Sequence, residues 1–427
     1  MTVQPSKNDR GSNLPYLTSN MPGVGGIIKR FDEDFLVEEI PRYAASGSGT
    51  HVYFKIEKRG LPTLVAIRRI ADRLGRKPNE IGYAGLKDAH GVTRQWLSLE
   101  HVDERLVADL SLDGIQVTTV GRHTNKLKLG HLAGNRFVVK IREVIRTCVD
   151  NVEAIVAELS RRGVPNYFGP QRFGVRGDNA AVGCAVLRGD LETAISIMLG
   201  RPAASDREDV RKARSLFDAG DFSGAADAWP GKLAGNAGIC RAYAGSGGDA
   251  RKAWRSVDHS LRKLYVSSVQ SELFNGYLAQ SVSRIDRLTT GDVAWKHANG
   301  ACFLVEDATV EQPRCDAFEI SPTGPLFGKK MKEARGAPAA LEQTIIEQSG
   351  LAQSQIRILD GKKLDGARRP LRVPLKDAAV TAGSDEHGPF VALAFELPPG
   401  AYATNVTREI CKTLDRYHRL SRSLGAP

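Results

Sequence analysis

One short stretch of the sequence combines a carboxylate, a cation and small residues in a way that suits catalysis. Residues Gly82–Leu99 read GYAGLKDAHGVTRQWLSL, with Lys87 and Asp88 between a short strand expected at Ile81–Leu86 and a loop expected to carry His90–Gln95. The glycines allow a substrate or another backbone to approach closely. A neighbouring cation such as Lys87 favours an ionised Asp88, which can act as a nucleophile or a base. A salt-bridged aspartate in a structural turn explains the same pattern.

A second stretch carries side chains that can hold a nucleotide base. Residues Val164–Gly174 read VPNYFGPQRFG. The amide of Asn166 can hydrogen-bond a base edge, the ring of Phe168 can stack on a base, and Arg172 can contact a phosphate. An aromatic pair packed in the core beside a Gly-Pro turn is the other interpretation.

A third stretch is rich in cations. Residues Arg122–Arg136 read RHTNKLKLGHLAGNR and suit a loop that contacts phosphates, because each neutralised phosphate releases condensed counterions. A solvated basic surface explains the same composition. The candidate contacts are Arg122, Lys126, Lys128 and Arg136.

A fourth stretch lies near the end of the chain. Residues Leu397–Glu409 read LPPGAYATNVTRE, in which a strand is expected to end at the Pro-Pro-Gly segment. Tyr402 follows that turn, and Thr404 or Asn405 is a candidate cap for the next helix. A purely structural turn is again the alternative.

The composition favours a polyanionic partner. The chain of 427 residues has 60 Lys and Arg against 49 Asp and Glu, a formal net charge of +11. A basic balance attracts nucleic acid, although a generally basic surface has the same composition. The six cysteines form no C-x-x-C pair and no zinc-ligand spacing, so we expect no metal site and a reducing compartment.

The sequence shows no targeting or membrane segment. Residues 1–13 are polar and lack the apolar stretch of a signal peptide. No run reaches the roughly 18 apolar residues of a membrane span. We therefore expect a cytoplasmic protein with no membrane partner, and a monomer.

Hydrophobic periodicity places strands at both ends of the chain and a different composition between them. The expected elements are strands at Asp34–Ile40, His51–Lys58, Asn135–Arg142 and Val391–Leu397, and helices at Thr63–Leu74, Val152–Arg162, Tyr265–Ile285 and from near Val406. Residues 200–256 are rich in Ala, Gly, Asp and Arg, and looser joints are expected at Gly245–Gly248 and Thr381–Gly388. This order predicts an α+β core interrupted by an inserted domain.

Taken together, the motifs resemble the tRNA pseudouridine synthase D (TruD) family. The ordered set is EDFLVEE, AGLKDAHGVTRQW, KLKLGHLAGNRF, NYFGPQRFG and LPPGAYATNVTRE, over about residues 24–190 and 374–415. A weaker likeness runs through SVQSELFNGYL and SPTGPLFGKKM in the middle of the chain.

The resemblance implies a particular fold and domain order. It implies an α+β pseudouridine synthase core, with a mostly antiparallel sheet and flanking helices, into which an α/β family-specific (TRUD) domain is inserted. We expect a flexible tail at 1–20, a discontinuous catalytic domain at 21–190 and 374–427, and the inserted domain at 191–373. Residues 200–256 have no counterpart that the resemblance places, so the insertion is expected to be enlarged.

The resemblance also implies an activity and its residues. It makes Asp88 the catalytic carboxylate and tRNA the substrate, with uridine 13 of the D arm as the target. It assigns substrate contacts to Phe35, Lys87, Asn166, Phe168 and Tyr402, the last often being Phe in relatives. Because the reaction is an isomerisation, no cofactor or metal is expected. An RNA-binding or RNA-folding protein without this chemistry is the alternative hypothesis.

Overall fold

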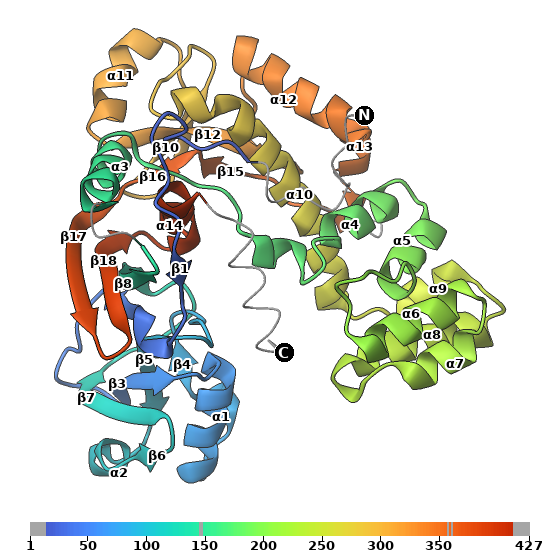
Figure 1. Ribbon diagram of the computed structural model, residues 1–427, viewed down its shortest axis with the longest axis horizontal. Helices are drawn as coiled ribbons and strands as arrows, with labels where there is room; N and C mark the ends of the chain where they lie inside the picture. The colour runs from blue at the N-terminus through green and yellow to red at the C-terminus, as the bar shows by residue number, and fades with distance from the viewer. Residues whose placement is uncertain (1–13, 145–147, 357, 360–361, 413–427) are drawn as a thin grey trace. The chain divides into compact units, whose positions relative to one another are not determined.

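The chain folds into two compact units. The computed structural model describes residues 14–144, 148–356, 358–359 and 362–412 (Figure 1). One unit, here the sheet unit, combines Thr18–Val164 with the described residues from Val373 onward, and the other, the middle unit, holds Pro165–Arg372 and residues 14–17. The chain enters the sheet unit at 17/18 and leaves it at 164/165, whereas the boundary was expected at 190/191. It returns at 372/373, next to the expected 373/374.

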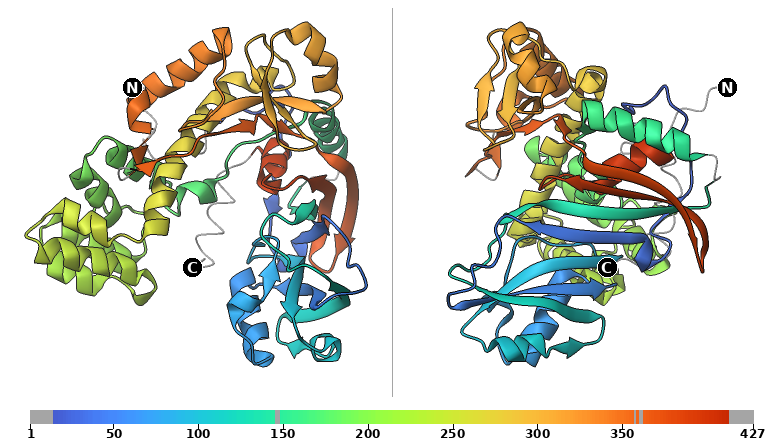
Figure 2. Two further views of the ribbon diagram at one scale, coloured as in Figure 1. Left: turned by 180° about the vertical axis from the view of Figure 1, so that it is seen from behind. Right: turned by 90° about the vertical axis from the view of Figure 1, so that its left-hand side faces the viewer.

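Both ends of the chain contribute strands to one sheet of ten strands. Its order is β17 (Lys376–Asp385), β18 (Gly388–Leu397), β8 (Leu132–Arg142), β2 (Phe35–Pro41), β5 (Val92–Glu100), β3 (His51–Arg59), β7 (Ile115–His123) and β6 (Ser111–Leu112), while β1 (Ile27–Ile28) pairs with β8 and β4 (Gly82–Tyr83) pairs with β5. Among these pairs β2–β5 is parallel and the others are antiparallel. Figure 2 shows the red C-terminal hairpin beside the teal β8. The expected α+β class with a mostly antiparallel sheet is confirmed.

Helices cover this sheet because the strands alternate in polarity. The inward side chains of β3 and β5, such as Phe54 and Leu97, form a core with Ile67 and Ile70 of α1 (Thr63–Arg73). Burying such side chains is the main driving force for placing the helix there. The remaining helical segments of this unit are η1 (Asp32–Asp34), η2 (Pro78–Glu80), α2 (Glu104–Ala108), α3 (Val149–Arg162) and α14 (Ala403–Cys411).

A buried ion network joins η1 to β8 and β17. The guanidinium of Arg142 donates from Nη2 to Asp34 Oδ1 at 2.6 Å and to Asp385 Oδ2 at 2.8 Å. The side chains of Arg142 and Asp34 are 3% and 0% exposed. A buried charge of this kind is tolerated only when it is paired, so the network fixes η1, which directly precedes Phe35.

The middle unit contains a helical bundle and a small sheet. Its helices are η4 (Pro170–Phe173), α4 (Asn179–Leu187), α5 (Leu191–Leu199), α6 (Glu208–Asp218), α7 (Phe222–Ala228), η5 (Gly231–Leu233), α8 (Ala234–Gly245), α9 (Ala250–Ser256), α10 (His259–Ser281), η6 (Val282–Arg284), α11 (Ala308–Asp316), α12 (Gly336–Ser349) and α13 (Gln353–Ile356). The four-stranded sheet has the order β11 (Cys302–Leu304), β10 (Val293–Lys296), β12 (Ile320–Leu326) and β15 (Ala367–Pro370). Short pairs are formed by β13 (Ile358–Leu359) with β14 (Lys362–Lys363) and by β9 (Val164–Pro165) with β16 (Arg372–Val373).

The Ala- and Gly-rich segment is a folded part of the middle unit. Residues 200–256 form α6 to α9, the compact green bundle of Figure 1, and share one core with α4 and α5. Trp229 and Trp254 are buried in that core together with many alanines. Small residues allow short helices to pack closely, which explains the composition that the sequence showed.

Three expectations about loose segments are corrected. Thr93–Gln95, expected in a loop, belong to β5. Thr93 and Gln95 are buried there, and Arg94 between them is half-buried. Thr381–Gly388, expected as a joint, forms the end of β17 and the turn into β18. Thr18, in the expected tail, is fully buried and donates from Oγ1 to Glu409 Oε2 at 2.7 Å. Residues 1–13 of that tail lie outside the described residues.

We predict that Asp34→Ala lowers the free energy of unfolding by about 3–5 kcal/mol, because it removes the partner of the buried Arg142. Urea unfolding followed by circular dichroism measures the change. The control is Glu33→Ala, whose carboxylate is 54% exposed and pairs with Arg59, with an expected loss below about 1 kcal/mol. Equal effects of the two substitutions would contradict the role of the network.

Candidate active site

Asp88 lies in the loop between β4 and β5 with its carboxylate accessible. Lys29 Nζ donates to Asp88 Oδ2 at 2.9 Å, and the two side chains are 13% and 36% exposed. Lys29 adopts a left-handed backbone conformation with φ of 56°, which is uncommon for a residue with a side chain. The ion pair therefore joins a partly exposed carboxylate to a cation held in a constrained turn after β1.

Phe35 belongs to the same cluster. Its ring is buried at the start of β2, and Lys29 Nζ lies 3.8 Å from the ring centroid. This is a cation–π distance, so the ring and Asp88 contact the same ammonium. Phe35 also lies 6.2 Å, centroid to centroid, from Phe137 on β8. The structure thus brings together Asp88 and Phe35, which the sequence singled out, through Lys29, which it did not.

Lys87 points away from Asp88 and into the protein. Its ammonium lies 2.7 Å from Glu39 Oε2 and donates to Asn135 Oδ1 at 2.9 Å. Burial raises the pKa of Glu39, and Lys87 opposes this rise. The expectation that Lys87 pairs with Asp88 is corrected, because Lys29 occupies that place.

Lys58 holds the main chain of the Asp88 loop. This fully buried lysine of β3 donates from Nζ to the carbonyl oxygen of Asp88 at 2.8 Å and to that of Leu61 at 2.5 Å. Burial lowers the pKa of Lys58 to about 8, while the charge of Asp88 partly offsets the effect. A buried ammonium thus fixes the backbone of Asp88 and leaves its carboxylate to Lys29.

Two further bonds anchor the same loop. The backbone N–H of Lys87 donates to Thr63 Oγ1 at 2.9 Å, and that of Gly91 donates to Asp32 Oδ1 at 3.0 Å. Gly91 has φ of 132°, and a Cβ there would lie 2.5 Å from the carbonyl oxygen of Phe35. A side chain at position 91 would therefore push the Asp88 loop away from β2.

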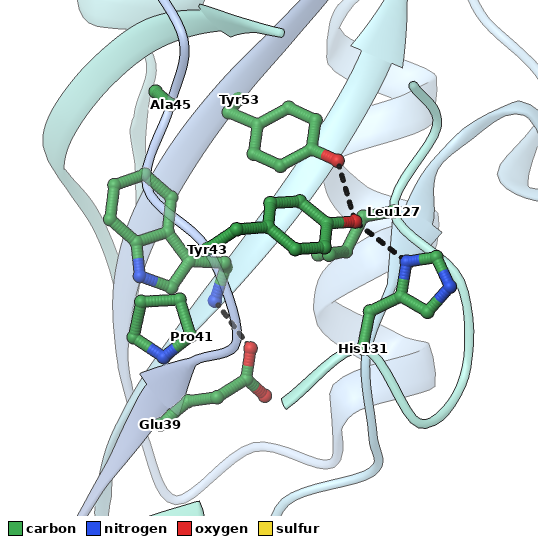
Figure 3. A pocket seen from close by; sticks show the side chains of 8 residues that line it. Glu39, Pro41, Tyr43, Ala45, Tyr53, Leu127 and His131 are labelled. Atoms are coloured by element: carbon green, nitrogen blue, oxygen red, sulfur yellow. Dashed lines mark hydrogen bonds between the residues drawn. The ribbon is translucent and has the colours of Figure 1, made fainter. Parts of the chain in front are cut away.

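A small aromatic hollow lies on the sheet unit beside Glu39 (Figure 3). The hydroxyl of Tyr43 lies 2.7 Å from His131 Nδ1 and 3.5 Å from the hydroxyl of Tyr53. The backbone N–H of Trp96 donates to Glu39 Oε1 at 3.4 Å. These are two separate sets of bonds, one joining Tyr53, Tyr43 and His131 and the other joining Trp96 to Glu39.

Asn166 and Phe168 lie in the middle unit, in a separate cluster. Asn166 is buried, its Nδ2 donates to Pro370 O at 2.9 Å, and its Oδ1 accepts from Arg369 Nη2 at 2.5 Å. The guanidinium carbon of Arg369 lies 4.2 Å from the ring centroid of Phe168. The ring also meets Phe274 edge-on at 5.5 Å. Asn166 thus positions a cation over the half-buried Phe168.

Tyr402 lies in the sheet unit, at the residue that precedes α14. It is half-buried, and its side chain makes no capping hydrogen bond to the helix. Thr404 and Asn405, the expected caps, are inside the helix instead.

Comparisons with known proteins match this chain over nearly its whole length. A family model described as tRNA pseudouridine synthase D (TruD) matches residues 12–410. The chain is 45% identical over 397 residues to a tRNA pseudouridine synthase D of Geobacter sulfurreducens, covering 93% of this chain and 96% of that protein. It is 36% identical over 406 residues to one from Thermus thermophilus, covering 94% and 93%. The chain belongs to the tRNA pseudouridine synthase D family.

A solved structure agrees with this membership. A crystal structure described as a tRNA pseudouridine synthase D from Methanosarcina mazei matches with a TM-score of 0.82 at 26% identity, over 95% of this chain and 97% of that one. Most of residues 200–256 therefore has a structural counterpart, which corrects the expectation of an enlarged insertion. Family membership makes the chain a pseudouridine synthase, an isomerase, rather than a binding protein without chemistry.

The cations expected to contact RNA in this TruD family member differ in how they are engaged. Arg122 pairs with Glu104, and Arg136 Nη2 lies 2.8 Å from Glu396 Oε1. Lys126 Nζ donates to the carbonyl of Asn79 at 2.8 Å, and Lys128 is exposed. In the middle unit, Arg172 Nε donates to Ser271 Oγ at 3.1 Å. Lys126 and Lys128 are thus the sheet-unit candidates without a described acidic partner.

The described residues include neither a helix that could cross a membrane nor a cluster that could bind a metal. Across these residues no helix combines the length and apolar composition that crossing a membrane requires. Nor do three or more His, Cys, Asp or Glu side chains gather there in a group that could hold a metal ion.

We predict that the stability contributed by Lys58 depends on pH. Because the folded pKa is about 8 against an ordinary 10.5, the unfolded chain binds a proton between these values that the native protein lacks. The free energy of unfolding of the wild type should therefore rise, relative to Lys58→Met, as pH increases from about 8 to about 10.5. Urea unfolding at the two ends of this range measures the difference. A constant difference would contradict the burial of a charged Lys58.

Proposed function

We propose that this protein isomerises uridine 13 in the D arm of tRNA to pseudouridine, with Asp88 as the catalytic carboxylate. The observation that carries the site is the ion pair of Lys29 with a 36%-exposed Asp88 whose backbone is fixed by the buried Lys58. A group that reacts with a substrate has to be accessible and held in place, and Asp88 meets both requirements. The proposal of tRNA as the substrate and of uridine 13 as the target rests on the resemblance to the family.

The isomerisation of uridine needs an ionised carboxylate in its first step. The N1–C1′ bond breaks, the base turns, a C5–C1′ bond forms, C5 loses its proton and N1 gains one. Asp88 can begin this by attacking C1′, by attacking C6 or by removing the C2′ proton, and each route starts from the carboxylate. The ammonium of Lys29 donates to Asp88 Oδ2 and would favour this form of the carboxylate.

Aromatic side chains are the proposed contacts for the target base. A uridine in folded RNA has to leave its stack to reach Asp88, and stacking on aromatic rings offsets part of that cost. We assign substrate contacts to Phe35, Tyr402 and Phe168. The bonds of Asn166 to Arg369 and Pro370 favour an indirect role, in which Asn166 holds Arg369 over Phe168. Lys87 supports the site through Glu39 and Asn135.

We predict that Asp88→Asn lowers the rate of pseudouridine formation by at least about 10²–10⁴-fold while tRNA binding is retained, because the amide keeps the shape and loses the carboxylate. Pseudouridine mapping on a tRNA transcript, with filter binding in parallel, measures both. Asp113→Asn, which changes an exposed carboxylate of the same unit, is the matched control and should leave the rate unchanged. Turnover by Asp88→Asn at the wild-type rate would remove Asp88 from the reaction.

We also predict that Lys29→Met lowers kcat by about tenfold or more, because the partner that holds the Asp88 carboxylate is lost. KM for tRNA should change little, since one surface phosphate contact at most is removed. Lys55→Met is the control, because Lys55 also forms an ion pair, with Glu38, on the same unit. An equal loss of kcat in both variants would show a general charge effect.

A further inference from the structure

Two strongly exposed leucines lie on two loops of the sheet unit, one of which carries Asp88. Leu86 is 62% exposed and stands two residues before Asp88, and Leu129 is 67% exposed in the segment between β7 and β8. Single exposed leucines are common on protein surfaces, so exposure alone carries no conclusion. These two leucines differ from scattered ones because the loops that carry them are hydrogen-bonded to each other.

The two loops are fastened to each other and to the sheet. The backbone N–H of Gly130 donates to the carbonyl of Ala84 at 2.8 Å, and that of Leu127 donates to Ser98 Oγ on β5 at 2.9 Å. A Cβ on Gly82 would lie 2.4 Å from the carbonyl oxygen of Leu127, so the backbones touch without room for a side chain. The exposed leucines are therefore carried by anchored segments.

The surroundings of the leucines are cationic. Lys126–His131 reads KLKLGH and contains no acidic residue, and Lys128 is exposed next to Leu129. The loop of Leu86 has Asp88 as its one carboxylate between Gly82 and Gly91, and this carboxylate is paired with Lys29. Apolar side chains bordered by cations match a partner that offers both phosphates and base faces.

We propose that Leu86 and Leu129 form an apolar wedge that contacts the bases flanking the target uridine, with Lys128 on a neighbouring phosphate. This rests on the proposed function and adds how the base leaves its stack. Apolar side chains inserted beside bases occur where proteins unstack nucleic acid, and an extruded base leaves a gap that such side chains can fill. The charge around the leucines favours RNA as the occupant over a second protein surface.

The test compares Leu86→Ala/Leu129→Ala with Leu106→Ala. Leu106 is 60% exposed on α2 of the same unit, away from these loops in the sequence. All three side chains are exposed, so unchanged thermal melting is expected for both variants. The substrate is a tRNA transcript with 2-aminopurine next to the target uridine, whose fluorescence rises when that base unstacks.

The wedge predicts that the double variant loses about tenfold or more in kcat/KM and loses the fluorescence rise, whereas Leu106→Ala retains both. Wild-type values for the double variant would overturn the wedge. So would a loss of self-association in sedimentation with kcat/KM unchanged, because the surface would then bind a second copy.

Failure of the proposed function gives a different result. The fluorescence signal is also recorded with Asp88→Asn, in which turnover is blocked. One outcome is a fluorescence rise with Asp88→Asn that is lost when Leu86→Ala and Leu129→Ala are added to it. If the wild type at the same time forms no pseudouridine, the wedge is supported and the assigned reaction is overturned. A fluorescence rise that is the same with and without the two leucine substitutions would overturn the wedge, whatever the rate of pseudouridine formation.

Discussion

The sheet unit depends on the need of buried ammonium groups for oxygen partners. Lys58 and Lys87 are both buried, and removing such charges from water costs free energy that only close acceptors offset. Lys58 finds its acceptors in the carbonyls of Leu61 and Asp88, and Lys87 finds them in Glu39 and Asn135. Both lysines therefore hold the loop between β4 and β5 against the sheet and so position Asp88.

The residues that support the Asp88 loop are different from the residue that contacts the Asp88 carboxylate. The buried lysines bind backbone or buried side chains, whereas Lys29 alone of the three lysines meets the carboxylate of Asp88. The ion network of Asp34 with Arg142 fixes η1, from which Asp32 binds the backbone N–H of Gly91. The far end of the Asp88 loop is thereby tied to the segment that leads into Phe35. A partly exposed carboxylate is held from several sides without being covered.

The middle unit uses a similar principle with a different cation. Asn166 has the donor and acceptor groups that suit a base edge, yet the structure directs them to Pro370 and Arg369. Arg369 in turn lies over the ring of Phe168. In the middle unit the motif residue Asn166 holds a neighbouring cation, whereas in the sheet unit the motif residue Asp88 is itself held by two lysines.

The sequence by itself determined the fold class, the strands β2, β3, β8 and β18, the helices α1, α3, α10 and α14, and the segment that carries Asp88. These are local properties, because alternation along β3 or β18 and the helical stripe of α1 depend on neighbours a few residues away. These predicted elements differ from the observed bounds mainly at their ends. The long strands β5, β7 and β17 were missed, because their polar residues resemble those of loops. The roles assigned to Phe35, Asn166, Phe168 and Tyr402 came from the family motifs and stay predictions.

Only the tertiary structure decided which charges meet. Lys87 is next to Asp88 in the sequence, but it is buried against Glu39, while Lys29 reaches Asp88 from the turn after β1. These pairs depend on the register of β2 against β8 and on the left-handed turn at Lys29, which no local pattern encodes. Adjacent side chains leave the backbone in different directions, so proximity in the sequence does not select an ionic partner. Burial selects the partner, because a cation that is removed from water has to bind an oxygen atom that lies within reach in the folded protein.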